Sequence, residues 1–128
     1  MTLCAPADFQ FDSKFLATLK QVVPQLNLTI TTDIASAVAK ADVIYTDVWA
    51  SMGQEDEAQT RRAAFLPYQV NADAMKVAPS AARFLHCLPA HRGDEVTDEV
   101  IDGDQSLIYQ QAENRMHIAA SLLVTLIE

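Results

Sequence analysis

The stretch that decides the fold lies past the middle of the chain: Phe84-Leu85-His86-Cys87-Leu88-Pro89-Ala90-His91-Arg92-Gly93. The apolar run over 81–85 predicts a buried strand. Pro89 ends it, because proline lacks the N–H that a strand ladder needs and its φ is fixed. The three residues before Pro89 therefore lie where a strand opens into a loop. In an open α/β sheet, ligands bind at this carboxyl edge. The stretch thus predicts that the carboxyl edge of the sheet carries a thiol, an imidazole and two backbone N–H groups. We call this edge the rim.

Two interpretations of Cys87 stay open on spacing alone. The thiol is either a small apolar group packed in the core or a functional group presented at the rim. A metal site is disfavoured, because His86 and Cys87 are adjacent and adjacent side chains on a strand point to opposite faces.

The composition limits the classes of protein to consider. A chain of 128 residues, half of them apolar, is one domain with enough apolar side chains for a core. A net charge of −8 argues against a nucleic-acid or anionic-membrane surface. No apolar run has transmembrane length, and the start does not resemble a signal peptide. Two cysteines, Cys4 and Cys87, do not make a disulfide framework and favour a reducing cytoplasm. Three glycines leave no Gly-rich phosphate loop.

Strand and helix patterns alternate along the whole chain. Strands are predicted over 1–5, 26–31, 41–46, 84–88 and 106–109. Helices are predicted over 14–23, 34–40, 55–64, 72–77, 98–101 and 112–127, with N-caps at Asp12 or Ser13, Asp33, Asn71 and Thr97. This alternation predicts an α/β fold, a mostly parallel sheet with helices on both faces. The last helix carries an apolar stripe formed by Met116, Ala119, Ala120, Leu123, Val124 and Ile127, and we expect the chain to expose apolar helix faces. Met1 already lies in a strand pattern, so we expect a segment upstream of it.

Two further motifs carry candidate functional residues. The predicted strand over 41–46 ends in the loop Asp47-Val48-Trp49-Ala50-Ser51-Met52-Gly53-Gln54, and the last helix begins with Ala112-Glu113-Asn114-Arg115. Taken singly, Asp47 is explained as a cap, Ser51 as a turn residue and Arg115 as a surface cation. Together with His86-Cys87-Leu88-Pro89, these motifs resemble the ornithine-binding half of the ornithine carbamoyltransferases, over essentially the whole chain. The Ser-Met-Gly loop and the cysteine set this resemblance apart from the aspartate carbamoyltransferases.

The resemblance implies a Rossmann-like fold and a reaction. In that reaction the δ-amine of ornithine attacks the carbonyl carbon of carbamoyl phosphate, giving citrulline and phosphate. The amine must lose a proton first, because a free alkylamine is mostly protonated at pH 7. The resemblance places Asp47 on an amino group of ornithine, and Ser51 with the backbone of Met52 on its α-carboxylate. Cys87 lies near the δ-amine and assists its deprotonation, and the loop around Gly53 closes over the substrate.

The carbamoyl phosphate contacts follow in the same way. Arg115 reaches carbamoyl phosphate as an always-charged donor, and Cys87 and Leu88 touch its carbamoyl end. Asp47, Cys87 and Arg115 are thus the residues expected to be catalytic, and a relay from Glu95 through His86 to Cys87 is a weaker expectation. The resemblance implies no cofactor and no metal. Its partners are L-ornithine and carbamoyl phosphate as substrates, with no nucleic acid, no membrane, and a trimer-based homo-oligomer in complete family members.

The chain departs from the family in what it lacks. The Ser-Thr-Arg-Thr phosphate loop and the His-Pro-x-Gln motif of the family's N-terminal domain are absent from the sequence. The first strand of the ornithine domain, with its ornithine-binding asparagine, is absent as well. We therefore expect residues 1–128 to form an ornithine-binding domain without its carbamoyl phosphate domain. Its sheet should lack a central strand, which leaves two unpaired edges facing a gap, and the chain should be inactive alone and dependent on a partner. An amino-acid-binding remnant and a structural piece that associates with a complete homologue remain the alternatives.

Overall fold

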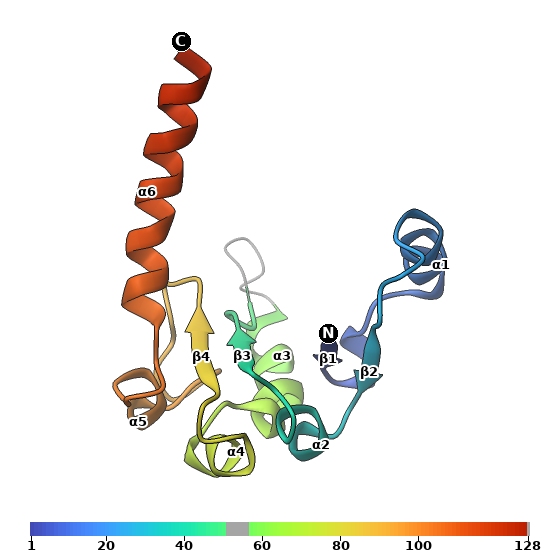
Figure 1. Cartoon of the computed structure of the whole chain (residues 1–128). Coiled ribbons are helices and arrows are strands. Elements are labelled where there is room, and N and C mark those ends of the chain that lie inside the picture. The colour runs from blue at the N-terminus through green and yellow to red at the C-terminus, as the bar shows by residue number, and fades with distance from the viewer. Residues whose placement is uncertain (51–56, 128) are drawn as a thin grey trace.

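The computed structural model describes residues 1–50 and 57–127, which form an α/β arrangement of parallel strands and helices (Figure 1). Strands β1 (Thr2–Cys4) and β2 (Thr29–Thr31) pair in one parallel sheet. Strands β3 (Val43–Thr46) and β4 (Arg83–His86) pair in a second one. The helices are α1 (Ser13–Val22), α2 (Ile34–Val38), α3 (Ala58–Phe65), α4 (Ala72–Val77), α5 (Asp98–Ile101) and α6 (Ile108–Ile127), with short 3-10 turns η1 (Ala7–Phe9) and η3 (Leu66–Tyr68).

The parallel pairing confirms the predicted fold class, but the strands do not join into one sheet. Among the described residues, the order is β1-β2 in one sheet and β3-β4 in the other. In Figure 1, β1 and β3 are the inner strands of the two pairs, so each has one edge without a partner strand. This arrangement agrees with the prediction that a central strand is missing and that two edges face a gap.

The core lies against the second sheet. Ile44 of β3 and Phe84 of β4 are cross-strand partners, and Phe84 is fully buried. Helices from several parts of the chain cover them, and each contributes apolar side chains. The buried cluster consists of Val38, Ile44, Val70, Met75, Ala78, Ala82, Phe84, Val96, Val100, Ile101 and Ile108. Burial of this apolar surface is the main favourable term for this half of the structure.

Three of the predicted helix caps are confirmed. The Asp12 side chain accepts the Phe15 N–H at 2.8 Å, and Asp33 accepts the N–H groups of α2 in the same way. Asn71 accepts the Ala74 N–H at 3.0 Å, and α4 has the predicted bounds. Each side chain satisfies N–H groups that the first turn of a helix leaves without a partner. Thr97 precedes α5 as predicted, but its hydroxyl makes no capping bond.

One prediction about the C-terminal region is wrong. The strand predicted over 106–109 does not form, because only Ser106 bridges to Phe84 and α6 already begins at Ile108, which is buried in the core. The stripe of α6 is exposed, as expected for the apolar helix faces: Met116 is 62% exposed and Ile127 is 81% exposed. Figure 1 shows the reason, since the helix extends away from the rest of the chain. Ile108 is its one buried residue.

The first helix is similarly open. The apolar face predicted for α1 includes Phe15 and Val22, and none of the residues of α1 is buried. The strand predicted over 26–31 is shorter than expected, because the Leu26 N–H bonds to the Val23 carbonyl in a turn. Across the part of the chain that the structure describes, no helix is long and apolar enough to cross a membrane.

Candidate active site

The site is built at the carboxyl ends of β3 and β4. Tyr45 and Leu85 are partners in the parallel register, and side chains alternate along each strand. Asp47 and Cys87 lie two residues beyond these partners, so all four side chains start from the same face. The Cys87 thiol donates a hydrogen bond to Asp47 Oδ1, with 3.0 Å between sulfur and oxygen. The two residues therefore meet at one point, as the sequence predicted.

Asp47 is held by its own backbone as well. The Val48 N–H donates to Asp47 Oδ1 at 2.7 Å, so the same oxygen accepts from a backbone N–H and from the thiol. Asp47 itself is exposed, and Cys87 is half-buried. The interpretation of Cys87 as a fully buried core residue is thus wrong, because the chain turns out of β4 at His86 and leaves the thiol at the rim.

Helix α6 supplies the third predicted residue. Arg115 Nη1 donates to the Cys87 carbonyl oxygen, which brings a fixed positive charge to the end of β4. Gln111 lies one turn earlier on the same face of the helix, and its Oε1 accepts the His86 N–H at 3.0 Å. The first turns of α6 therefore close the rim over the strand end.

His86 and Glu95 form a separate pair on the other face of the strand. Both side chains are fully buried, and His86 Nε2 lies 3.1 Å from Glu95 Oε1. The Leu88 N–H donates to His86 Nδ1 at 2.8 Å. Because Nδ1 accepts, Nε2 carries the proton and donates to the carboxylate. Glu95 Oε1 also accepts the His91 N–H at 2.7 Å.

The structure gives the predicted relay no path to the thiol. Adjacent residues of a strand face opposite ways, so His86 points to the buried side while Cys87 points to the rim. Among the described residues, the hydrogen bonds of the His86 and Glu95 side chains lead to one another and to the N–H groups of Leu88 and His91, whereas the thiol donates to Asp47. The pair therefore fixes the turn that follows β4.

That turn has an unusual backbone. Leu88 has φ of 58°, in the left-handed region that costs an L-residue about 1–2 kcal/mol. The Leu88 N–H bond to His86 and the packing of the Leu88 side chain against the core offset this strain. Nothing in the sequence signals this conformation, because glycine or asparagine usually occupies it.

The loop that follows β3 is only partly described. Ser51, Met52 and Gly53 were predicted to bind or close over a substrate, and they lie outside the described residues. Trp49, just before them, stacks on Phe65 of α3 with ring centroids 6.1 Å apart. Phe65 in turn packs on Phe9 of η1 at 4.8 Å. The start of the loop is thus anchored by aromatic contacts that run through α3 to η1.

Two residues of the site were missed by sequence reasoning, Tyr45 and Gln111. Tyr45 starts from the same face as Asp47 and Cys87 because of the parallel register, and Gln111 of α6 accepts the His86 N–H beside them. Partial burial and the hydrogen bond to Asp47 raise the pKa of the Cys87 thiol. Partial burial and the neighbouring thiol also raise the pKa of Tyr45. The site therefore holds a neutral thiol and a neutral phenol at pH 7. Two signals in the sequence could have found these residues. Tyr45 lies two residues before Asp47, and Gln111 lies one helical turn before Arg115.

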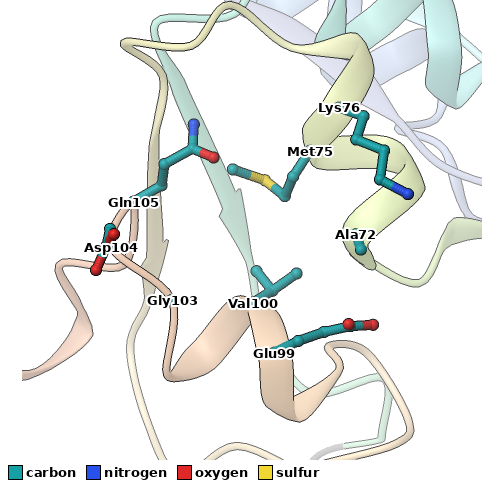
Figure 2. A pocket seen from close by; sticks show the side chains of 8 residues that line it. All are labelled: Ala72, Met75, Lys76, Glu99, Val100, Gly103, Asp104 and Gln105. Atoms are coloured by element: carbon teal, nitrogen blue, oxygen red, sulfur yellow. The ribbon is translucent and has the colours of Figure 1, made fainter.

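A separate pocket lies between α4 and α5, away from this rim (Figure 2). Its volume is about 340 Å³, and its lining residues are Ala72, Met75, Lys76, Glu99, Val100, Gly103, Asp104 and Gln105. Two of its polar side chains are engaged within the protein: Lys76 pairs with Asp73 at 2.9 Å, and the Gln105 amide donates to the Ala82 carbonyl at 2.9 Å. None of the predicted site residues lines it, so we place the candidate active site at the rim.

Comparison with known proteins identifies the class. The family model for the "Aspartate/ornithine carbamoyltransferase, Asp/Orn binding domain" matches residues 1–126. The chain therefore belongs to the aspartate/ornithine carbamoyltransferase family and corresponds to its Asp/Orn binding domain.

Within the family, several similar relatives are named ornithine carbamoyltransferase. The chain is 46% identical over 130 residues to the ornithine carbamoyltransferase of Mycolicibacterium smegmatis, covering 100% of this chain and 42% of that protein. The solved ornithine carbamoyltransferase from Pyrococcus furiosus matches with a TM-score of 0.83 and 47% identity, over 95% of this chain and 40% of that one. The anabolic enzyme from Campylobacter jejuni matches with a TM-score of 0.85 and 30% identity, over 98% of this chain and 42% of that one. The chain thus spans about two-fifths of the length of these relatives.

Proposed function

We propose that this chain is the ornithine-binding domain of an ornithine carbamoyltransferase, over residues 1–128. In the complete enzyme, the carbamoyl group of carbamoyl phosphate would be transferred to the δ-amine of L-ornithine, giving citrulline and phosphate. The observation that carries this proposal is the meeting of the Cys87 thiol and the Asp47 carboxylate, 3.0 Å apart, beside Arg115 at the rim. The names of the relatives support the choice of ornithine.

The amino group of ornithine is assigned to Asp47. The Val48 N–H and the Cys87 thiol both use Oδ1, so we assign Oδ2 to the incoming ammonium group. Bound beside the thiol, the ammonium group gives one proton to solvent, and the neutral amine attacks the carbamoyl carbon as its bond to the phosphate oxygen breaks and phosphate leaves. Positioned groups of this kind contribute about 10²–10⁴-fold to a rate. Ser51 and the backbone of Met52 are assigned to the α-carboxylate.

The carbamoyl phosphate end is assigned to Cys87, Leu88 and Arg115. The Leu88 N–H is used by His86, so the groups available to the carbamoyl amide are the backbone carbonyls of Cys87 and Leu88. Arg115 bonds to the Cys87 carbonyl and would turn to the phosphate when that ligand binds. The buried His86–Glu95 pair would hold this turn in place, and we propose no proton transfer through it.

One guanidinium does not suffice for a doubly charged phosphate, because the chain carries a net charge of −8. We therefore propose that a carbamoyl phosphate domain completes the site. It would correspond to the part of the relatives that the chain does not span. The complete protein would be a trimer-based homo-oligomer of the cytoplasm that needs no metal and no cofactor.

The test is an assay of the chain alone and after complementation. The purified chain is mixed with ornithine and carbamoyl phosphate, and citrulline is measured before and after adding the N-terminal part of an ornithine carbamoyltransferase. We expect no citrulline from the chain alone, because most of the positioning of carbamoyl phosphate is absent. Citrulline should form only when both parts are present.

Asp47→Asn should abolish the recovered activity, whereas Asp42→Asn, at the opposite end of β3, should leave it unchanged. Citrulline made by the chain alone would refute the need for a second domain. Ornithine binding without citrulline in the mixture would favour an amino-acid-binding remnant, and association with a complete homologue without ornithine binding would favour a structural piece.

A further inference from the structure

One oxygen of the buried Glu95 carboxylate has no hydrogen-bond partner. Glu95 is fully buried, and its Oε1 accepts from His86 Nε2 at 3.1 Å and from the His91 N–H at 2.7 Å. Its Oε2 is buried as well, but none of the described residues bonds to it. Leaving a buried carboxylate oxygen without a donor is costly, so a donor that can reach Oε2 should stabilise the fold.

The His91 side chain stands beside this oxygen. Its Nδ1 lies 3.9 Å from Glu95 Oε2, which is beyond hydrogen-bond distance. The imidazole is 60% exposed, whereas the carboxylate is fully buried, so the ring lies in solvent at the edge of the buried group. The His91 backbone is already fixed by its N–H bond to Oε1. Rotation of the side chain alone, by about 1 Å at the ring, would therefore complete the contact.

We propose that His91 is a positioning residue of the rim, whose protonated imidazole donates to Glu95 Oε2 and holds the turn after β4 in place. Histidine gains its charge between pH 5 and 8, and the charged ring donates from both nitrogens. The folded turn offers that ring a buried carboxylate, and the opened turn does not. Acidification through this range therefore favours the folded turn.

Glu95 connects His91 to the rim through two further hydrogen bonds. His86 Nε2 donates to the carboxylate, and His86 Nδ1 accepts the Leu88 N–H at 2.8 Å. Leu88 directly follows Cys87 and has the left-handed φ of 58° that these bonds must maintain. A carboxylate held by a third donor restricts the His86 ring, and with it the backbone of the turn. The effect of His91 on turnover rests on the proposed function, because this turn carries Cys87 and Leu88.

The other charged side chains around the turn already have partners. Arg62 of α3 pairs with Asp94 at 2.7 Å, and Arg92 pairs with Asp98 of α5 and with Asp102, each at 2.7 Å. Aspartate and arginine side chains normally keep their charge between pH 5.5 and 8. These pairs therefore contribute no pH dependence of the turn in the range in which histidine titrates.

His86 is the other histidine at this carboxylate, and its titration would act in the opposite direction. A proton on His86 Nδ1 would remove the acceptor of the Leu88 N–H and loosen the turn at low pH. A proton on His91 would instead add a donor to Glu95 Oε2 and tighten the turn. The direction of the pH effect therefore tells the two histidines apart.

The experiment measures amide hydrogen exchange of the full chain by NMR at pH 5.5 and pH 8. Dividing the intrinsic exchange rate at each pH by the observed rate gives the protection factor, which reports local opening. The protection of the Leu88 and His91 N–H groups should be about threefold higher at pH 5.5, the scale of a partly exposed ion pair. The Phe84 N–H, which bonds to the Gln105 carbonyl at 2.8 Å, is the internal reference and should show no such difference.

Two histidine variants provide the matched comparison. His91→Gln should abolish the difference between the two pH values, because the glutamine amide cannot take up a proton. His117→Gln removes a histidine that also lies four residues from a glutamate, with 3.5 Å between His117 Nε2 and Glu113 Oε1. Both side chains of that pair are exposed on α6, so this variant should leave the difference unchanged.

Equal protection of the turn at both pH values would overturn the proposal. Protection that falls at pH 5.5 would overturn it as well and would assign the titration to His86. An equal change at the Phe84 N–H would show that the stability of the whole fold had changed, which also contradicts a local role of His91.

Activity of the complemented enzyme separates this proposal from the proposed function. His91→Gln should lower kcat by up to about threefold at pH 6 and leave it unchanged at pH 8. An unchanged kcat at both pH values would overturn the positioning role. A pH-dependent protection without any citrulline production would keep the contact between His91 and Glu95 and reject the ornithine carbamoyltransferase function. Citrulline production with equal protection at both pH values would do the reverse.

Discussion

The two parallel strand pairs of this chain have nearly equal lengths and very different surroundings. The packed unit, residues 34–108 as far as they are described, contains β3, β4, α2, α3, α4 and α5 and nearly all of the buried side chains. The open unit, residues 1–33, contains β1, β2 and α1, and Ala5 is its one buried residue. Both units have paired strands and capped helices. A strand pair thus acquires a core only where helices cover its face. The candidate site lies on the packed unit, which has such a core.

The largest difference between the units should appear in a matched pair of phenylalanine substitutions. Phe84 is fully buried in the packed unit, and Phe15 is 46% exposed in the open unit. Phe84→Ala should lower the free energy of unfolding by about 3–5 kcal/mol, because it leaves a cavity in the core. Phe15→Ala should lower it by less than about 1 kcal/mol. Urea unfolding, followed by the fluorescence of the single tryptophan Trp49, measures both. Equal losses would show that the open unit has a core of its own.

The next effect concerns the two cysteines, one in each unit. Cys87→Ala should lower the activity of the complemented enzyme about 10²-fold or more, the scale of a positioned acid–base group. Cys4→Ala should leave turnover unchanged and affect stability only, since Cys4 is a partly buried strand residue. Citrulline assays on both variants decide this, and full activity of Cys87→Ala would remove the thiol from amine handling.

A smaller effect separates two helix caps. Asp33 caps α2, which contacts both β1 and α4, whereas Asp12 caps α1 in the open unit. Each substitution to alanine removes a capping bond that contributes about 1 kcal/mol. Asp33→Ala should therefore lower the urea midpoint of the whole chain. Asp12→Ala should only speed amide hydrogen exchange within α1. A drop in the global midpoint with Asp12→Ala would mean that the two units unfold together.

The smallest effect is a pH-dependent ion pair of the packed unit. Arg92 donates to Asp102 at 2.7 and 2.9 Å and lowers the pKa of that carboxyl. A lowered pKa in the folded state means that the pair stabilises the fold above the usual carboxyl pKa of about 3.9, and that this stabilisation is lost as the pH falls through the lowered value. Asp102→Asn should therefore reduce the urea midpoint slightly at pH 7, and this difference should shrink as the pH falls below the usual carboxyl pKa of about 3.9. Because the pair is exposed, 1 M salt should also diminish the difference. A difference that does not shrink with falling pH would indicate a packing effect.

The parts of the fold that depend on residues close together in the sequence were predictable from it. Asp12, Asp33 and Asn71 cap their helices because a short polar side chain meets an N–H two or three residues ahead. The convergence of Asp47 and Cys87 followed from the rule that parallel strands end at one edge. An amphipathic pattern shows which face of a helix is apolar, but it does not show which part of the protein packs against that face. The stripe on α6 was therefore correct as a pattern, and its exposure follows from the absence of a packing surface in the described chain.

The details of the site depended on contacts between distant segments. Glu95 lies nine positions from His86, and their pairing arises from the turn after β4. The left-handed conformation of Leu88 is fixed by that pairing and by the surrounding core, so its residue type carries no signal. Tyr45 looked like an ordinary strand residue, because tyrosine is common in strands for packing reasons.

The two unpaired strand edges also have a consequence for the behaviour of the chain in solution. An open edge is a template on which the strand of another copy can add, so the chain has a built-in route to self-association. The net charge of −8 opposes this route, because copies repel one another before their edges meet. Salt shortens the range of that repulsion to about 8 Å at physiological ionic strength and about 3 Å at 1 M. Solubility should therefore be highest in dilute, low-salt buffer.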